Sequence, residues 1–289
     1  MPLRPQLHSK TLGMLTAQFV IAPLEEDVKL RVGIFATPLK SYNCTVRVSS
    51  SNPFPQADTV PDLRGIAIKL ADFNQDFVLL NVPTLPFGKP SAFSRQGKKD
   101  VSAVNLEMRK SGYAKALLEM TPARLNPSCP FDQQYWSTSL FKYGPNRMCK
   151  YSLVPTSAHS SPIPKQMGES YLSEAIQSHL EQHPASFDFM AQFGDEQFTI
   201  KEVGEFLGFQ FPLETPYVKL ATLNIPQQNM SMVVSRKTNS FRPNHALPEH
   251  AALGDSSWPR LGVRNALAVV KQLSSKGKGE LGDEKKTIV

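Results

Sequence analysis

The sequence has few cysteines and no long apolar run. Its three cysteines are far apart, at Cys44, Cys129 and Cys149, which excludes a disulfide framework and a cysteine-rich zinc site. No stretch of about 18 consecutive apolar residues occurs, so we expect no membrane-spanning helix. The opening residues MPLRPQLHSK lack the apolar segment of a secretory signal. These absences predict a soluble cytoplasmic protein.

Acidic residues are outnumbered, with 25 Asp and Glu against 32 Lys and Arg, which leaves a net charge of +7. Such a charge can indicate a nucleic-acid partner. The excess gathers in residues 88–115 and in residues 271–289. Neither segment has zinc-finger spacing or the interleaved aromatic residues of RNA-binding segments. We therefore interpret them as a solvated basic segment and a flexible tail, and we expect no nucleic-acid partner.

The common catalytic motifs are missing as well. The chain has no GxSxG elbow, no HExxH pair and no phosphate-binding loop of the GxxxxGK type. It does have 24 prolines against 16 glycines, which predicts many rigid loops and few long helices. With 40% hydrophobic residues, it can still bury a sizeable core.

The pattern of apolar residues predicts mostly strands, with a few helices. Residues 28–37 illustrate the strand pattern, since Val28, Leu30, Val32 and Ile34 alternate with other residues. In residues 170–183, by contrast, leucine and isoleucine recur every four residues, and Pro184 ends the pattern. The predicted strands cover residues 14–21, 28–37, 44–49, 65–70, 76–80, 148–154, 186–193 and 217–225. The predicted helices lie within residues 98–120, 170–183 and 259–273. This order predicts one α+β domain with a β-barrel.

Several segments carry a more specific signal than the periodicity. They are HSKTLG (8–13), LRVGIFAT (30–37), VRVS (46–49), ADTVPDLRGIAIKL (57–70), QDFVLLNVPTLPF (75–87), MCKYSLVP (148–155), TPYVKLATLNIPQ (215–227) and FRPNHALPEHAALG (241–254). Taken in this order, they resemble the heme catalase superfamily, in particular its short catalase-related branch. The resemblance covers about residues 4–270. It implies a catalase-like domain over residues 1–272, followed by a flexible basic tail over residues 273–289.

The resemblance implies an antiparallel β-barrel that encloses a heme, with helices packed outside it. The implied activity is that of a heme oxidoreductase acting on hydrogen peroxide or an organic hydroperoxide, as in secondary metabolism. His8 matches the histidine that transfers the peroxide proton, and Ser49 matches the serine that hydrogen-bonds this histidine. Arg47 matches an arginine that pairs with a heme propionate. Asn81 is the nearest match to an asparagine that orients the peroxide, although the register is open by one residue because Leu80 precedes it. An oligomer is possible.

The sequence departs from the family pattern at the iron ligand. The family supplies a tyrosinate from the last helix, four residues after an arginine. If Arg260 is that arginine, the ligand position holds Arg264; if Arg264 is, the position holds Ala268. Neither side chain can replace a phenolate, and no tyrosine follows Tyr217.

Two interpretations therefore remain open. In the first, the chain is a heme enzyme with an unusual ligand, for which His245 and His250 are the nearby imidazole candidates. In the second, the chain keeps the catalase fold without heme, and either binds another small ligand or has a non-catalytic role. The retained His8, Arg47 and Ser49 favour the first interpretation, and the missing tyrosine favours the second.

Overall fold

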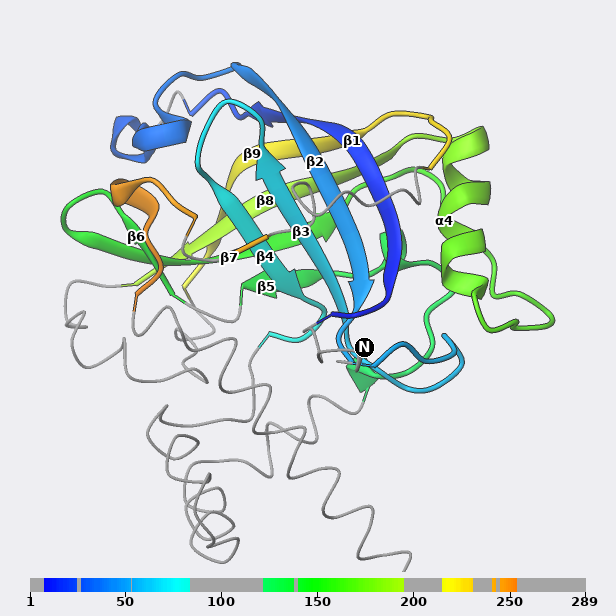
Figure 1. The fold of residues 1–289 in the computed structure, drawn as a ribbon. Helices are drawn as coiled ribbons and strands as arrows, with labels where there is room; N and C mark the ends of the chain where they lie inside the picture. The colour runs from blue at the N-terminus through cyan, green and yellow to red at the C-terminus, as the bar shows by residue number, and fades with distance from the viewer. Residues whose placement is uncertain are drawn as a thin grey trace, which may run out of the picture.

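The computed structural model describes residues 8–24, 27–52, 54–83, 122–137, 140–194, 215–230, 241–242 and 245–253. Within these residues, eight antiparallel strands follow one another in the order β5-β4-β3-β2-β1-β9-β8-β7, and pairing of β5 with β7 closes the sheet into a barrel (Figure 1). A further strand, β6, pairs with β7 and forms an isolated bridge between Phe141 and Ala252. The strands are β1 (Thr11–Ile21), β2 (Ser41–Ser50), β3 (Arg64–Leu70), β4 (Asp76–Leu80), β5 (Tyr135–Ser137), β6 (Phe141–Tyr143), β7 (Arg147–Pro155), β8 (Ala185–Phe193) and β9 (Tyr217–Ile225).

Alternation along the strands turns one set of side chains into the barrel, where aromatic rings meet. The ring of Phe77 in β4 lies 5.8 Å from that of Phe19 in β1 and 4.7 Å from that of Phe189 in β8. Phe189 in turn lies 5.0 Å from Tyr151 in β7. Since these strands come from opposite walls, side chains fill the centre of the barrel. This packing contradicts the expectation that the barrel encloses a heme, so a heme site would have to lie on its outer side.

The strand predicted for residues 28–37 is wrong. The chain forms two 3₁₀ turns there, η1 (Val28–Leu30) and η2 (Gly33–Phe35). The side chain of Asp27 accepts a hydrogen bond from the backbone N–H of Lys29 and so begins the first turn. Gly33 has a φ of +53°, which an extended strand does not allow. Local capping and a left-handed glycine therefore override the alternating pattern.

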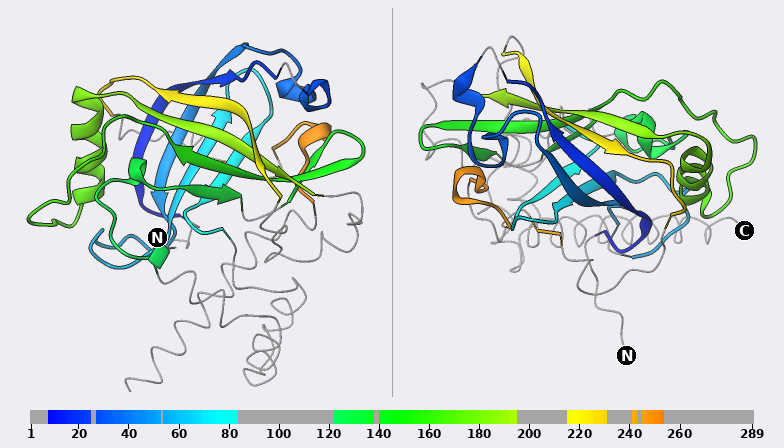
Figure 2. Two further views of the ribbon diagram at one scale, coloured as in Figure 1. Left: turned by 180° about the vertical axis from the view of Figure 1, so that it is seen from behind. Right: turned by 90° about the horizontal axis from the view of Figure 1, so that it is seen from above.

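The helix predicted for residues 170–183 is confirmed as α4 (Tyr171–Gln182), which stands beside the barrel and contacts β1 (Figure 2). Leu172, Ile176 and Leu180 are fully buried, as expected for one apolar stripe of a surface helix. Two further short turns are η4 (Pro130–Asp132) and η5 (Pro248–His250). The helices predicted within 98–120 and 259–273, and the tail over 273–289, lie outside the described residues. Among the described helices, none is long and apolar enough to cross a membrane.

Candidate functional site

His8 lies just before β1, at the end of the barrel where β2 finishes. Its Nδ1 is 2.9 Å from the Oγ of Ser49 near the end of β2. This contact matches the pairing that the sequence predicted for the two residues. The backbone of His8 has a φ of +56°, a left-handed conformation that is uncommon outside glycine. Neighbouring contacts must therefore hold it there.

Arg47 supplies one such contact. Its Nη2 donates to the backbone carbonyl of His8, and its Nε donates to Thr11 Oγ1 at 3.0 Å. Arg47 thus fastens the segment that carries His8 onto β2. Its Nη1 makes no hydrogen bond with the described residues. The predicted contact between Arg47 and a propionate would have to use this remaining group.

The environment of His8 favours the neutral imidazole. Burial lowers the pKa of His8 to about 4, and the positive charge of Arg47 acts in the same direction. The ring is therefore uncharged at neutral pH. Within the part of the chain that the structure describes, Nδ1 is engaged by Ser49, and Nε2 has no hydrogen-bond partner. A neutral imidazole with one fixed and one available nitrogen can accept a proton at Nε2.

The register of the sheet shows which residues share the outer face with His8. Ser49 pairs with Gly65, and Gly65 pairs with Leu80, so these three positions form one row across β2, β3 and β4. Residues directly opposite each other in an antiparallel pair lie on the same face. The next outer row is Arg47, Ala67 and Val78. Beside His8, the outer face is therefore built from small and apolar side chains on β3 and β4.

Gly65 lies directly against the imidazole. A Cβ atom on Gly65 would be 2.7 Å from Cε1 and 3.0 Å from Nδ1 of His8. Real Cβ contacts are essentially never that short, so only a glycine leaves room for the ring in this position.

Asn81 lies at the same end of the barrel as His8, but its side-chain amide bonds Arg64, Ala123 and Gln133 and not His8. Its Oδ1 accepts a hydrogen bond from the backbone N–H of Arg64 at 2.8 Å. Its Nδ2 donates to the carbonyl of Ala123 at 2.7 Å and to Gln133 Oε1 at 3.3 Å. Leu80, rather than Asn81, occupies the row that contains Ser49 and Gly65. The structure thus leaves the amide of Asn81 bonded within the protein, and its role toward peroxide stays a prediction.

His245 and His250 lie at the opposite end of the barrel from His8. His245 Nδ1 is 3.0 Å from Asp76 Oδ2 at the start of β4. His250 is fully buried, and its Nε2 accepts a hydrogen bond from the backbone N–H of Ile34 at 3.3 Å. From Tyr42, which bonds Ile34, to Ser49, strand β2 rises by roughly 23 Å. His250 therefore cannot bind an iron that His8 faces, whereas His245 is held by Asp76, whose row in the sheet contains Thr45.

The described residues show no metal-ligand cluster near His8. They contain no group of three or more His, Cys, Asp or Glu side chains that could hold a metal ion. Burial raises the pKa of the three cysteine thiols to about 12, so they are not thiolates. Arg264 and Ala268 lie outside the described residues. His8, Arg47 and Ser49 thus lie together, and the described residues contain no metal-ligating cluster beside them.

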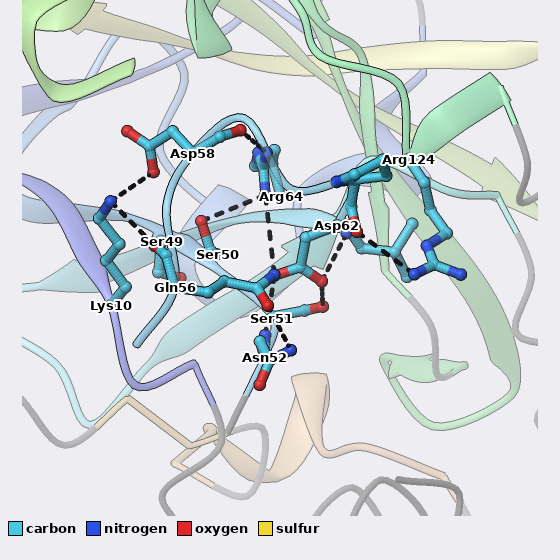
Figure 3. A network of polar contacts seen from close by, with 12 residues as sticks. Lys10, Ser49, Ser50, Ser51, Asn52, Gln56, Asp58, Asp62, Arg64 and Arg124 are labelled. Atoms are coloured by element: carbon cyan, nitrogen blue, oxygen red, sulfur yellow. Dashed lines mark hydrogen bonds and ion pairs between the residues drawn. The ribbon is translucent and has the colours of Figure 1, made fainter. Parts of the chain in front are cut away.

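One set of residues near His8 was recognised in the sequence only as part of a motif. The loop of residues 51–64 carries Asp58, Asp62 and Arg64, whose side chains are buried in a polar network (Figure 3). Arg64 Nη2 donates to the carbonyl of Asp58 at 3.1 Å, and Arg64 Nη1 lies 3.7 Å from Asp62 Oδ2. The sequence offered one signal for this network: three charged residues within seven positions of a proline-bearing loop. Buried charges need partners, so such a cluster indicates that the three side chains bond to one another or to the nearby backbone.

Comparison with known proteins supports the fold alone. No family model matches the sequence, and no curated protein does either. Among solved structures, a fungal catalase is similar with a TM-score of 0.67 and 17% identity, over 90% of this chain and 57% of that one. Catalase A from Saccharomyces cerevisiae gives 0.66 and 17%, over 92% and 59%. A bacterial catalase gives 0.64 and 15%, over 90% and 55%.

The chain therefore spans a little over half the length of the catalases that it resembles. At this identity the likeness establishes the architecture and not the activity. It confirms the prediction of an α+β fold with an antiparallel barrel of catalase type.

Proposed function

Given that the chain has the catalase fold, we propose that it is a heme-dependent oxidoreductase acting on a hydroperoxide. The observation that carries the proposal is the neutral imidazole of His8, fixed by Ser49 and seated on Gly65. Next to His8, the outer face of β3 and β4 carries the small or apolar residues Gly65, Ala67, Val78 and Leu80. Such a surface suits one face of a planar, apolar group. Catalases of this fold support the analogy without deciding it.

In this proposal, a bound heme would supply the iron chemistry for cleaving the O–O bond of a peroxide. His8 would accept the proton of the peroxide at Nε2 and return it to the oxygen that leaves as water or an alcohol. Ser49 keeps the imidazole in one orientation by bonding Nδ1. Arg47 would direct its remaining Nη1 to a propionate of the heme.

The outer row favours an organic hydroperoxide over hydrogen peroxide. Leu80 faces the side of the sheet that carries Ser49 and Gly65, and it belongs to an apolar cluster with Leu63 and Val82. A hydrocarbon substituent gains contact with such a surface, whereas hydrogen peroxide needs hydrogen-bonding groups around both oxygens. An orienting role for Asn81 would require its Nδ2 to leave Ala123 or Gln133.

A second candidate function is that of a heme-free protein with the catalase fold that binds another small ligand. It is favoured by the sequence at the expected iron ligand, where Arg264 or Ala268 replaces the tyrosine. It is also supported by the contacts of the two alternative imidazoles, since His250 bonds the backbone of Ile34 and His245 bonds Asp76.

An absorbance spectrum of the protein produced with excess heme distinguishes the two functions. We expect a Soret band, and we expect the variant His8→Ala to keep this band while losing at least about a hundredfold in hydroperoxide turnover. His159→Ala is the matched control, because its imidazole packs on His183 and contacts no residue of the site. A flat visible spectrum would contradict the heme proposal and leave the second candidate.

A further inference from the structure

The motif ADTVPDLRG (57–65) is the most specific string in the sequence, and its residues surround the segment that carries His8. Its last residue, Gly65, lies in β3 directly under the imidazole, where a Cβ atom would come within 2.7 Å of Cε1. The position of the His8 ring thus depends on glycine, which has no side chain, at residue 65 of the motif.

The loop also holds the two residues that follow His8. The backbone N–H of Ser9 and its Oγ both donate to the carbonyl of Asn52, at 3.1 Å and 2.9 Å. Lys10 Nζ pairs with Asp58 Oδ1 at 2.8 Å and donates to the carbonyl of Gln56 at 3.1 Å (Figure 3). These contacts, together with that of Arg47 to the His8 carbonyl, hold a left-handed residue at the head of a strand.

The loop is itself anchored on both sides. Asp62 accepts hydrogen bonds from Ser51 Oγ at 2.6 Å and from the backbone N–H of Asn52 at 2.9 Å. Asp58 Oδ2 accepts a hydrogen bond from the backbone N–H of Leu172 in the first turn of α4, at 3.1 Å. The carboxylates of the motif therefore fix the loop to itself and to the helix, which gives Lys10 a rigid partner.

We propose that this motif acts as a positioning device for His8, in which Gly65 seats the imidazole and the Lys10–Asp58 ion pair holds its backbone in the left-handed conformation. Gly65 and Lys10 are positioning residues, since they act through His8. The inference depends on the proposed function only for its effect on turnover. The placement of the imidazole can be measured in the protein without heme.

The test follows the His8 imidazole by nitrogen-15 NMR during a pH titration, with His8→Gln used to assign its signals. In the wild-type protein we expect an apparent pKa of about 4 and a single tautomer that reflects the bond to Ser49. In Gly65→Ala the added methyl displaces the ring, so the apparent pKa should rise toward the ordinary value of 6.5 and the tautomer preference should be lost. Gly168→Ala is the matched control, because a Cβ atom there has no atom within 4 Å.

A second variant covers the case in which Gly65→Ala does not fold. Lys10→Met removes the ion pair to Asp58 at a partly exposed position outside the hydrophobic core, and it should raise the His8 pKa in the same direction. Unchanged His8 signals in both folded variants, or in Lys10→Met alone if Gly65→Ala does not fold, would overturn the inference. A missing Soret band with shifted His8 signals would instead refute the heme proposal and leave the positioning role intact.

Discussion

Each end of the barrel has a histidine packed against a glycine, and the two pairs are built differently. His8 lies on Gly65, whose backbone is ordinary, and His8 itself takes the left-handed conformation. At the far end, Gly33 takes the left-handed conformation, with a φ of +53°, and the buried His250 lies on it. Among the described residues, Nε2 of His8 has no hydrogen-bond partner, whereas Nε2 of His250 bonds the backbone of Ile34. We therefore assign a structural role to His250.

The pair at the far end leads to a prediction about stability. A Cβ atom on Gly33 would lie 2.3 Å from His250 Nε2, so Gly33→Ala combines backbone strain with displacement of a buried ring. We expect it to lower the free energy of unfolding by about 3 kcal/mol or more. Gly144→Ala is a close control, because Gly144 also has a positive φ of +70° but its nearest neighbouring atom is 3.5 Å away. Chemical denaturation should show a loss of only about 1 to 2 kcal/mol in this control. Equal losses in the two variants would mean that the contact with His250 contributes nothing.

At the scale of the elements, the register between strands decides which residues can act together. The pairing of Ser49 with Gly65 and of Gly65 with Leu80 is a property of the sheet, and a shift by one residue would turn Asn81 to the outer face instead. The sequence left the register open by one residue, because Leu80 occupies the position next to Asn81 where many catalases have another asparagine. In the structure, Leu80 shares the row of Ser49 and Gly65, and the role of Asn81 stays a prediction.

The position of Leu80 in the row of Ser49 predicts that its replacement by asparagine changes the substrate preference. Leu80→Asn places an amide in the row that contains Ser49 and Gly65, so it should raise the ratio of turnover with hydrogen peroxide to turnover with cumene hydroperoxide by about tenfold. Val28→Asn is the control, because it makes the same kind of change at an exposed position outside the site. Steady-state kinetics of the heme-loaded variants gives the two ratios. An unchanged ratio in Leu80→Asn would remove the argument for an organic hydroperoxide.

At the scale of the whole molecule, the closed barrel places its aromatic core, the partly buried His8 and the fully buried His250 in one folded unit. Burial lowers the pKa of both His8 and His250 to about 4. The unfolded chain, with histidine pKa values near 6.5, therefore binds more protons than the folded chain between these values. Stability from this source is complete above about pH 6.5 and is lost as the pH falls toward 4.

This linkage gives a measurable pH dependence. For the fully buried His250, a fall in pKa from 6.5 to about 4 corresponds to a contribution on the order of 3 kcal/mol. Denaturant unfolding at several pH values should show this loss in the wild-type protein. His250→Gln keeps an acceptor for the Ile34 amide and does not titrate, so it should reduce the slope of stability against pH. A slope identical to that of the wild type would show that His250 does not become protonated on unfolding.

The sequence by itself determined seven of the eight strands predicted, the helix over residues 170–183 and the resemblance that relates His8 to Ser49. These features depend on local periodicity and on residue identity, which a sequence displays directly. It failed for residues 28–37, where a capping Asp27 and a left-handed Gly33 override alternation.

Only the tertiary structure decided which of the candidate residues meet. It brought His8, Arg47 and Ser49 together, placed Leu80 rather than Asn81 in the row of Ser49, and separated His250 from them by most of the length of β2. The physical reason is that strand register and barrel closure depend on pairings between distant parts of the chain, so neighbours in space cannot be read from neighbours in sequence.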